Sequence, residues 1–423
     1  MRQLFLIEDS PANKISYYLL LSFVVTLPFD YFYSQLILIC FAFHTLIYAR
    51  RSNLKQLFSK PVLILISIYL LGILALFYSA DKQEGFNILT RQLAILLFPV
   101  LFSLTELDFK KYRLNILCIF GITCTFTILY LYADAVHTIF YFHMPMASLF
   151  TLLFMNHNFS LPIEIHATYL SVYTAFSLLL FIYLTFESKG LLKKWVCIIA
   201  AFILCAGLIQ LSSRSVFIAF LLIINLVFPF FLFYGRKRVI FLVAASVISA
   251  ATLLAITRVD SFKTRYINEL KTDLTKNARI IENTEPRVAR WNAILELIKK
   301  SPVIGYGTGA EKSLLKEKYF EKGLFFSYLN EFNAHNEYLS FLLKTGIIGL
   351  AVFVYVLFYG FSAAVRNGDL LFLSFMMLVA ITCISENFLE LNKGIFFYGF
   401  FFSFFIESFR MRRKYRDGYL AKA

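Results

Sequence analysis

The chain contains repeated runs of apolar residues that are long enough to cross a membrane. A bilayer core about 30 Å thick is crossed by roughly 20 apolar residues in a helix. Runs of this kind lie near residues 15–29, 31–49, 61–79, 89–106, 114–135, 166–187, 195–212, 215–234, 238–257, 336–363, 369–385 and 394–409. The sequence therefore predicts an all-α integral membrane protein with about 12 transmembrane helices.

The composition agrees with a membrane protein. Of the 423 residues, 59% are hydrophobic and only 16% are charged, whereas about 25% are charged in a typical soluble domain. These values exclude a disordered chain and argue against an ordinary soluble enzyme. The six cysteines lie in apolar runs without a CxxC pair. They are interpreted as small buried hydrophobic residues, not as a disulfide or metal framework.

The basic residues indicate the orientation of the chain, whose net charge is +15. Lys and Arg gather on one set of alternating loops, whereas the opposite segment 136–165 contains neither. Because cytoplasmic loops are enriched in Lys and Arg, both termini are predicted to be cytoplasmic. Topology thus accounts for the charge, and nucleic acid is not expected as a partner. The basic positions are Arg50, Arg51, Lys55, Lys60, Lys110, Lys111, Arg113, Lys189, Lys193, Lys194, Arg236, Lys237, Arg238, Arg366 and the tail from Arg410 to Arg416.

A long polar segment, residues 258–335, is predicted on the outer side of the membrane. It divides the chain into nine predicted spans within 1–257, the outer loop itself, and the last three spans with a basic cytoplasmic tail within 336–423. Long loops are translocated largely regardless of their charge.

The outer loop is predicted to contain two helices. Residues 287–300 have an amphipathic pattern, with Thr284 as a possible N-cap and Pro286 suited to the first turn. A second helical stretch is predicted over roughly 311–322. Between them, Gly305, Gly307 and Gly309 predict a flexible turn.

Three arginines of the outer side are candidate anion ligands. Arg214 lies in a very tight connection between two apolar runs. Arg287 and Arg290 lie on one face of the first turn of the predicted helix, where free N–H groups attract anions. A guanidinium group can grip phosphate oxygens with two parallel hydrogen bonds. The alternatives are an interfacial arginine at 214 and a solvated helix face with Glu285 as its partner.

His335 is the candidate general base. It lies where the outer loop enters the tenth predicted span. A helix N-terminus disfavours the imidazolium form, and a neutral imidazole is the form that a base needs. The alternative is a structural histidine.

Other patterns are weaker. The glycines before Lys312-Ser313 resemble a phosphate-binding loop, but Glu311 breaks the required spacing. His143, His157 and His166 lack the spacing of metal ligands, so no metal site is expected. Lys344, inside a predicted span, is interpreted as a pairing or snorkelling lysine.

Several motifs together resemble the O-antigen ligase and polymerase superfamily. Residues 335–350 read HNEYLSFLLKTGIIGL and resemble the family's His-Asn and Gly-x-x-Gly-Leu signature. Residues 287–291 and 301–307 are similar to its Arg/Trp helix and its Pro-x-x-Gly-x-Gly turn, and Ser213-Arg214-Ser215 to its Ser-Arg pair. The segment 166–169 is similar to a His-x-Thr-Tyr motif, but has Ala167 where Pro is expected. The resemblance covers roughly 160–400.

The resemblance implies a glycosyltransferase of the bacterial inner membrane with a periplasmic loop. It implies that the donor is a glycan on undecaprenyl diphosphate and that no cofactor or metal is needed. Ligases transfer the glycan to lipid A–core, polymerases to another repeat unit, and related enzymes to Ser or Tyr of proteins. His335 then corresponds to the base, and Arg214 and Arg287 to the diphosphate ligands. Arg290 and Arg91 are further candidates for the diphosphate.

Among these readings, O-antigen ligase is favoured. One dominant outer loop is typical of ligases, whereas polymerases more often carry arginines on two sizeable loops. Polymerase and protein O-oligosaccharyltransferase remain as alternatives. A transporter for lipid-linked glycan is a further alternative, but it would place ionisable groups near the middle of several spans. The candidate residues instead cluster at the outer boundary.

Overall fold

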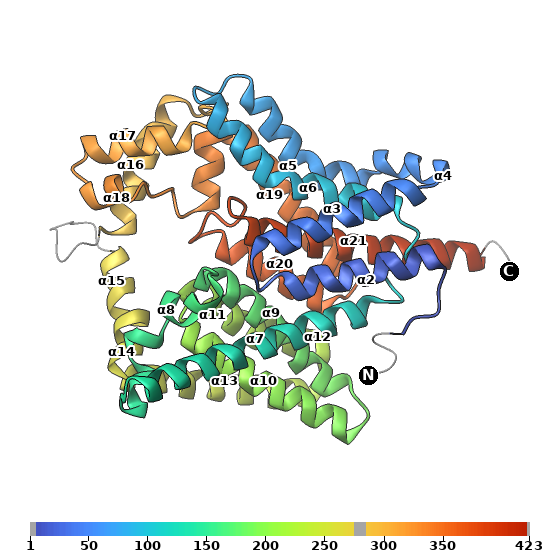
Figure 1. The fold of residues 1–423 in the computed structure, drawn as a ribbon, viewed down its shortest axis with the longest axis horizontal. Coiled ribbons are helices and arrows are strands. Elements are labelled where there is room, and N and C mark those ends of the chain that lie inside the picture. Colours follow the sequence, from blue (N-terminus) through green and yellow to red (C-terminus); the bar gives the residue numbers. More distant parts are fainter. Residues whose placement is uncertain (1–5, 275–284, 421–423) are drawn as a thin grey trace.

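The structure is a computed structural model that describes residues 6–274 and 285–420. The described residues form helices and no strands. Each of the predicted spans contains a helix, which confirms an all-α integral membrane protein (Figure 1). These helices are α2 (Pro11–Thr26), α3 (Tyr31–Tyr48), α5 (Lys60–Leu76), α6 (Lys82–Leu104), α7 (Arg113–Tyr141), α9 (Ala167–Glu187), α10 (Leu191–Leu211), α11 (Arg214–Leu222) continued by η5 (Ile223–Val227) and α12 (Phe228–Leu232), α13 (Gly235–Arg258), α19 (Glu337–Arg366), α20 (Leu370–Thr382) and α21 (Asn392–Leu420).

Not all of these helices are long enough to be simple spans. In the described part of the chain, eight are long and apolar enough to cross a membrane. A ninth is counted if α5 is joined to the short helices before it, α4 (Arg51–Leu54) and η1 (Lys55–Phe58), at a bend of 63°. Helix α20 has only 13 residues. The count of about 12 spans therefore stays a prediction.

Several helices extend beyond the predicted apolar runs, and α6 and α7 are two of them. Helix α6 begins at Lys82, because the Asp81 side chain accepts a hydrogen bond from the Glu84 N–H at 2.9 Å and caps it. Helix α7 continues to Tyr141, past the predicted end near residue 135. Hydropathy marks the apolar part of a helix but not the polar turns that continue it.

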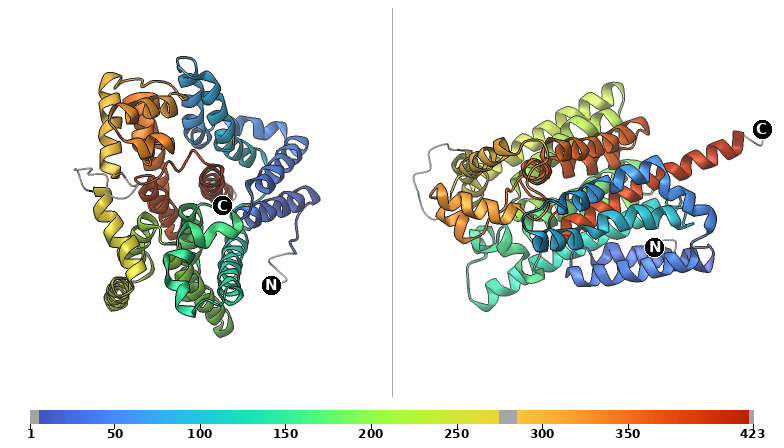
Figure 2. Two further views of the ribbon diagram at one scale, coloured as in Figure 1. Left: turned by 60° about the vertical axis from the view of Figure 1, so that its left-hand side comes forward. Right: turned by 90° about the horizontal axis from the view of Figure 1, so that it is seen from above.

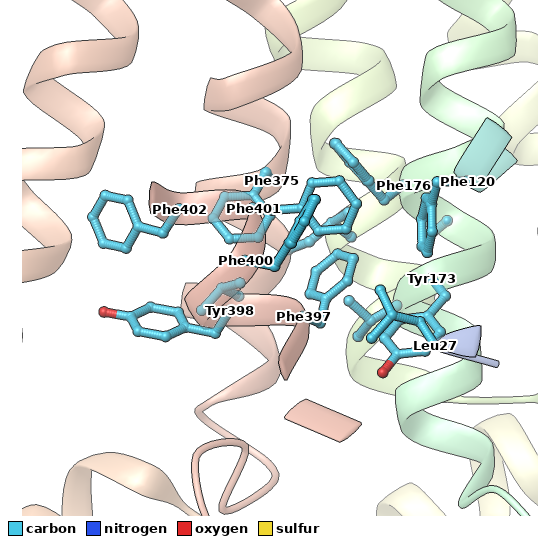
Figure 3. Packing of buried hydrophobic residues seen from close by; sticks show 14 of the residues in the cluster. Leu27, Phe120, Tyr173, Phe176, Phe375, Phe397, Tyr398, Phe400, Phe401 and Phe402 are labelled. Atoms are coloured by element: carbon cyan, nitrogen blue, oxygen red, sulfur yellow. The ribbon is translucent and has the colours of Figure 1, made fainter. Parts of the chain in front are cut away.

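Aromatic side chains of α21 fill the interior of the bundle. Figure 2 shows α21 running through the middle of the helices. In Figure 3, Phe397 and Phe401 point toward Phe120 of α7 and Tyr173 and Phe176 of α9, with ring centroids 5.0 to 5.3 Å apart in the closest pairs. In lipid, van der Waals packing is a main source of attraction between helices, and large aromatic rings supply much contact area.

A smaller cluster of helices lies at one end of the bundle. It consists of α16 (Arg287–Lys300), α17 (Glu311–Glu321) and α18 (Phe325–Leu329), packed around the buried Ile294, Leu315 and Tyr319 (Figure 1). Helix α16 covers the range that the amphipathic pattern predicts. Its N-cap is Pro286, and Thr284 lies outside the described residues.

Short helices complete this end, which is called the loop end below. α14 (Asp260–Lys263), η6 (Thr264–Asn268) and α15 (Glu269–Leu274) continue from α13. The connection from α7 to α9 forms η2 (Met146–Phe150), η3 (Leu152–Phe154), α8 (His157–Ser160) and η4 (Leu161–Ile163).

The glycine-containing turn after α16 docks onto a break in α19. Gly346 has φ 62° and ψ −162°, so α19 is interrupted there, within the predicted run 336–363. The Ile347 N–H donates to the Pro302 carbonyl at 2.9 Å, and the Gly307 N–H donates to the Lys344 carbonyl at 2.8 Å. The prediction of a flexible turn is therefore wrong: the turn supplies hydrogen bonds that the broken helix lacks.

Glycine is required on both sides of this contact. A Cβ atom on Gly346 would lie 2.1 Å from the Val303 carbonyl oxygen, and one on Gly305 would lie 2.5 Å from the Lys344 carbonyl carbon. Both residues also have positive φ, which side chains disfavour. The glycines of the Pro-x-x-Gly-x-Gly and Gly-x-x-Gly-Leu motifs thus allow two backbones to touch.

We expect Gly346→Ala to destabilise the docking of the outer helices. Gly368→Ala is the matched control, because Gly368 has φ 61° but nothing lies within 4 Å of its Cβ position. Steric overlap should therefore cost Gly346→Ala about 1–3 kcal/mol beyond the control. The measurement is thermal unfolding of both purified variants in detergent. Equal unfolding temperatures would contradict the close-contact explanation.

Candidate active site

A cavity of about 820 Å³ lies at the loop end. Its walls come from the start of α8 and α9, the connection between α10 and α11, η6 and α15, α16, and the residues before α19 and after α20. Arg214, Arg287, Arg290 and His335 all line it. The fold therefore brings together four candidate residues that are up to 121 positions apart in the sequence.

Arg214 is held at the cavity wall by a two-residue connection. Helix α10 ends at Leu211 and α11 begins at Arg214, with Ser212 between them in the left-handed region at φ 50°. The Arg214 side chain is only 14% exposed, and its Nη2 donates to Asp273 Oδ2 at 2.6 Å. Its Nη1 is buried without a hydrogen-bond partner in the described part of the chain.

The same carboxylate oxygen approaches Arg287. The Arg287 Nε lies 3.5 Å from Asp273 Oδ2, and its Nη1 donates to the Ser385 carbonyl at 3.0 Å. One anionic oxygen on α15 thus lies between guanidinium groups of α11 and α16. This is the arrangement by which two arginines hold a carboxylate or phosphate oxygen.

Arg290 is the most deeply buried of the candidate arginines. Its side chain lies over the Phe332 ring at 5.1 Å, and the residue is 7% exposed. Its Nε and Nη1 have no hydrogen-bond partner among the described residues. Burial, followed by the charge of Arg287, lowers the pKa of Arg290 from its ordinary value. An incoming anion would offset this desolvation.

Arg265 is a fourth arginine of the cavity that the sequence analysis missed. It lies in η6 and forms an ion pair with Glu269 one turn further on. An i,i+4 pair of this kind is typical of any exposed helix surface. The residues around Arg265 therefore did not distinguish it as part of a site. Glu285, the alternative partner of Arg287 and Arg290, instead accepts the N–H groups of Phe326 at 2.9 Å and Ser327 at 3.0 Å.

His335 lies directly before the N-cap of α19. Asn336 is that cap: its side chain accepts the Leu339 N–H at 3.1 Å. His335 itself has φ 44°, and the Asn333 side chain accepts its backbone N–H at 3.0 Å. A non-glycine residue in this region is uncommon and needs support from its surroundings. The His-Asn pair of the motif thus combines a helix cap with a fixed imidazole.

Glu386 is the polar partner of His335. The Nδ1 of His335 lies 3.3 Å from Glu386 Oε2, between α20 and α21. Burial would raise the pKa of Glu386, but the hydrogen bond and charge of His335, with His166 and Arg287 nearby, hold that pKa at about 2. An ionised carboxylate only accepts hydrogen bonds, so in the neutral form of His335 the proton lies on Nδ1 and Nε2 keeps its lone pair.

His157 and His166 form a second imidazole pair in the cavity. Their ring centroids are 4.1 Å apart. The Nδ1 of His157 accepts the Ala167 N–H at 3.4 Å, and the Nδ1 of His166 accepts the Thr168 N–H at 3.3 Å. Burial, with the neighbouring imidazole, lowers the pKa of His157 to about 4, and burial also lowers that of His166. Both rings are therefore neutral near pH 7.

A buried network of Lys344, Glu311 and Glu390 contacts the residues next to His335 and Glu386. Lys344 forms ion pairs with Glu311 at 3.1 Å and with Glu390, as expected for a pairing lysine. Glu311 accepts the Ala334 N–H and the Asn387 amide, each at 3.0 Å. Burial would raise the pKa of Glu311, but Lys344 and the hydrogen bonds from Ser340 and the Ala334 N–H lower it. The network fixes both neighbours of the His335–Glu386 pair.

Arg91 is not brought to this cavity. Its side chain forms an ion pair with Glu84 on the same helix at 3.1 Å, and it is not a lining residue. The position of Arg91 near the outer end of a predicted span did not determine the direction in which its side chain points. Among residues 6–274 and 285–420, no three His, Cys, Asp or Glu side chains are grouped as metal ligands. Metal independence stays a prediction.

The fold and cavity define a multi-pass membrane protein with an arginine-lined cavity at one end. Residues 199–354 match the family described as O-antigen ligase. The match begins in α10 and ends in α19, so it contains Arg214, Arg265, Arg287, Arg290 and His335. Within these residues the chain is similar to the O-antigen ligase superfamily, and the match supports a membrane enzyme of ligase or polymerase type. A search of curated proteins found no match.

We expect Asp273→Asn to strengthen the binding of a diphosphate anion to the purified protein. The neutral amide no longer competes for the two guanidinium groups, so inorganic pyrophosphate should bind about tenfold more tightly. The measurement is titration calorimetry in detergent. Asp260→Asn, an exposed position of α14, is the control for the same chemical change. Weaker binding to Asp273→Asn would mean that this carboxylate holds the arginines in place instead of competing.

Proposed function

We propose that the protein transfers a glycan from undecaprenyl diphosphate to a sugar hydroxyl of lipid A–core, as a metal-independent, inverting O-antigen ligase. One observation carries this proposal. Four arginines and the His335–Glu386 pair line a single cavity at the end of a membrane helix bundle. A diphosphate ester needs cationic ligands, and an acceptor hydroxyl needs a base beside them.

The arginines supply the donor site. Arg214 and Arg287 already share one anionic oxygen from Asp273, and Arg290 is a buried cation without complete hydrogen bonding among the described residues. The diphosphate takes the place of the Asp273 carboxylate between the first two. Arg290 and Arg265 stabilise its remaining charge. Arg91 has no part in this site.

His335 supplies the base. Its Nδ1–H is directed to Glu386, so the Nε2 lone pair accepts the proton of the acceptor hydroxyl. Glu386 then stabilises the imidazolium that forms, and it keeps the ring in the productive tautomer. Glu386 is a positioning residue, because it acts through His335.

The transfer itself is a single displacement. As the hydroxyl proton moves to His335, the acceptor oxygen attacks the anomeric carbon from the side opposite the diphosphate. The new C–O bond forms while the bond to the diphosphate oxygen breaks, and undecaprenyl diphosphate leaves with the electron pair. The anomeric configuration is therefore inverted. Guanidinium groups fixed at the leaving group stabilise its growing negative charge.

The proposed location is the bacterial inner membrane, with the cavity facing the periplasm. The support comes from the charge pattern: Arg366 ends α19 at the opposite end from His335, on the side where basic loops gather. The polyprenyl chain reaches the cavity from the surrounding membrane lipids.

The acceptor separates the ligase from its alternatives. If the gene is deleted, surface glycolipids should lose all long chains while polymerised lipid-linked glycan accumulates. Wild-type protein should restore the chains, and His335→Ala should not, although it is present in the membrane. The measurement is a glycolipid gel. A core band with one repeat unit would indicate a polymerase, and an unchanged ladder with lost glycoprotein bands would indicate protein glycosylation.

A second variant tests Glu386. Its pKa of about 2 leaves the carboxylate ionised at neutral pH. Glu386→Gln should lower the transfer rate about tenfold or more with donor binding unchanged, because the imidazolium that forms during transfer has lost its carboxylate partner. The measurement is transfer and donor binding by the purified variant. An unchanged transfer rate would contradict the pairing.

A further inference from the structure

A second cavity, of about 680 Å³, lies at the opposite end of the bundle. It is formed by the start of α5, the end of α19 and α21, and shares no lining residue with the first cavity. Its α19 residues begin at Tyr359, roughly 30 Å along that helix from its start at about 1.5 Å per residue. The transfer chemistry makes no use of it.

Basic side chains from three helices line this cavity. They are Lys60 at the start of α5, Arg366 in the last turn of α19, and Arg410 of α21. Arg410 pairs with Glu407 at 2.8 Å, and its Nη1 is buried without a hydrogen-bond partner in the described structure. Within residues 6–274 and 285–410, no carboxylate forms an ion pair with Lys60 or Arg366. The cavity is therefore cationic.

The rest of the lining is mixed. Ser362 supplies a hydroxyl group, whereas Pro61, Ala363, Ile406 and Phe409 are apolar. A cationic site with a neighbouring apolar surface fits a molecule that has an anionic group and hydrocarbon chains. A small hydrophilic anion would leave the apolar part unused.

The cations lie at the boundary of the apolar spans. The α4–η1 segment meets α5 at 63° directly before Lys60, and its Phe58 is 78% exposed, as expected for a segment that lies along a membrane surface. Arg366 ends α19, and Arg410 directly follows the apolar stretch of α21. All three therefore lie where the apolar spans end, which is the level at which lipid head groups are expected.

We infer that this cavity binds the phosphate head group of an anionic phospholipid, with its acyl chains along the apolar residues of α19 and α21. Basic pockets between transmembrane helices on the cytoplasmic side bind such head groups. The predicted cytoplasmic orientation of the basic loops is enough to explain why these cations are present. It does not explain why cations from three helices line one cavity.

The test compares lipids and variants of the full-length protein by native mass spectrometry. Wild type should retain phosphatidylglycerol at least about tenfold more tightly than phosphatidylcholine with the same acyl chains. Lys60→Gln with Arg366→Gln should bind phosphatidylglycerol roughly 25-fold more weakly, since each basic residue near an anionic lipid surface contributes about a factor of five. Lys193→Gln with Arg236→Gln is the matched control, because both residues are exposed and predicted on the same side.

The binding results either support or overturn the phospholipid site. Loss of phosphatidylglycerol in the first pair alone, with recovery in Lys60→Arg and Arg366→Lys, supports the site. Equal loss in both pairs, or no preference for phosphatidylglycerol, would overturn it in favour of general surface charge. Displacement of the lipid by inorganic phosphate at equal concentration would also overturn it, because the site would then hold a free anion.

Discussion

The contact of Asp273 with Arg214 and Arg287 joins the parts of the molecule that make the site. Arg214 belongs to the membrane bundle, Arg287 to the outer helices, and Asp273 to the segment between them. Two guanidinium groups this close repel each other unless an anion lies between them. The carboxylate therefore stabilises this arrangement, and in the proposed function the diphosphate of the donor takes its place.

The outer helices keep their position through backbone contacts as much as through charge. The turn at Pro302 to Gly307 replaces hydrogen bonds that α19 loses at Gly346. The Trp291 indole N–H donates to the Ala334 carbonyl at 3.1 Å and fixes α16 to the residue before His335. Because the arginines and His335 lie on elements held in this way, their spacing does not depend on side-chain contacts alone.

The sequence predicted those features that depend on residues close together in the chain. Apolar length located the helices, and the amphipathic pattern located α16 at Arg287–Lys300. The motif residues Arg214, Arg287, Arg290 and His335 do meet in one cavity. The role of the glycines was ambiguous in the sequence, because a glycine in a flexible turn and a glycine at a close backbone contact look the same there. Gly305 belongs to the second kind.

Tertiary contacts account for what the sequence did not reveal. Glu386 is 51 residues from His335, and only the packing of α20 and α21 beside α19 brings the two together. The His157–His166 pair depends on the fold of the connection between α7 and α9. Arg91 had a suitable depth, but its side chain pairs with Glu84 along its own helix.

In the proposed mechanism, the arginines bind the donor and His335 performs the proton transfer. The most direct test measures donor binding and glycan transfer separately in purified protein, with a synthetic lipid-diphosphate donor. Arg287→Ala should weaken donor binding by about tenfold or more. His335→Ala should bind the donor normally but transfer about 10²–10⁴-fold more slowly. Near-normal transfer by His335→Ala, or equal loss of donor binding in both variants, would contradict this division of roles.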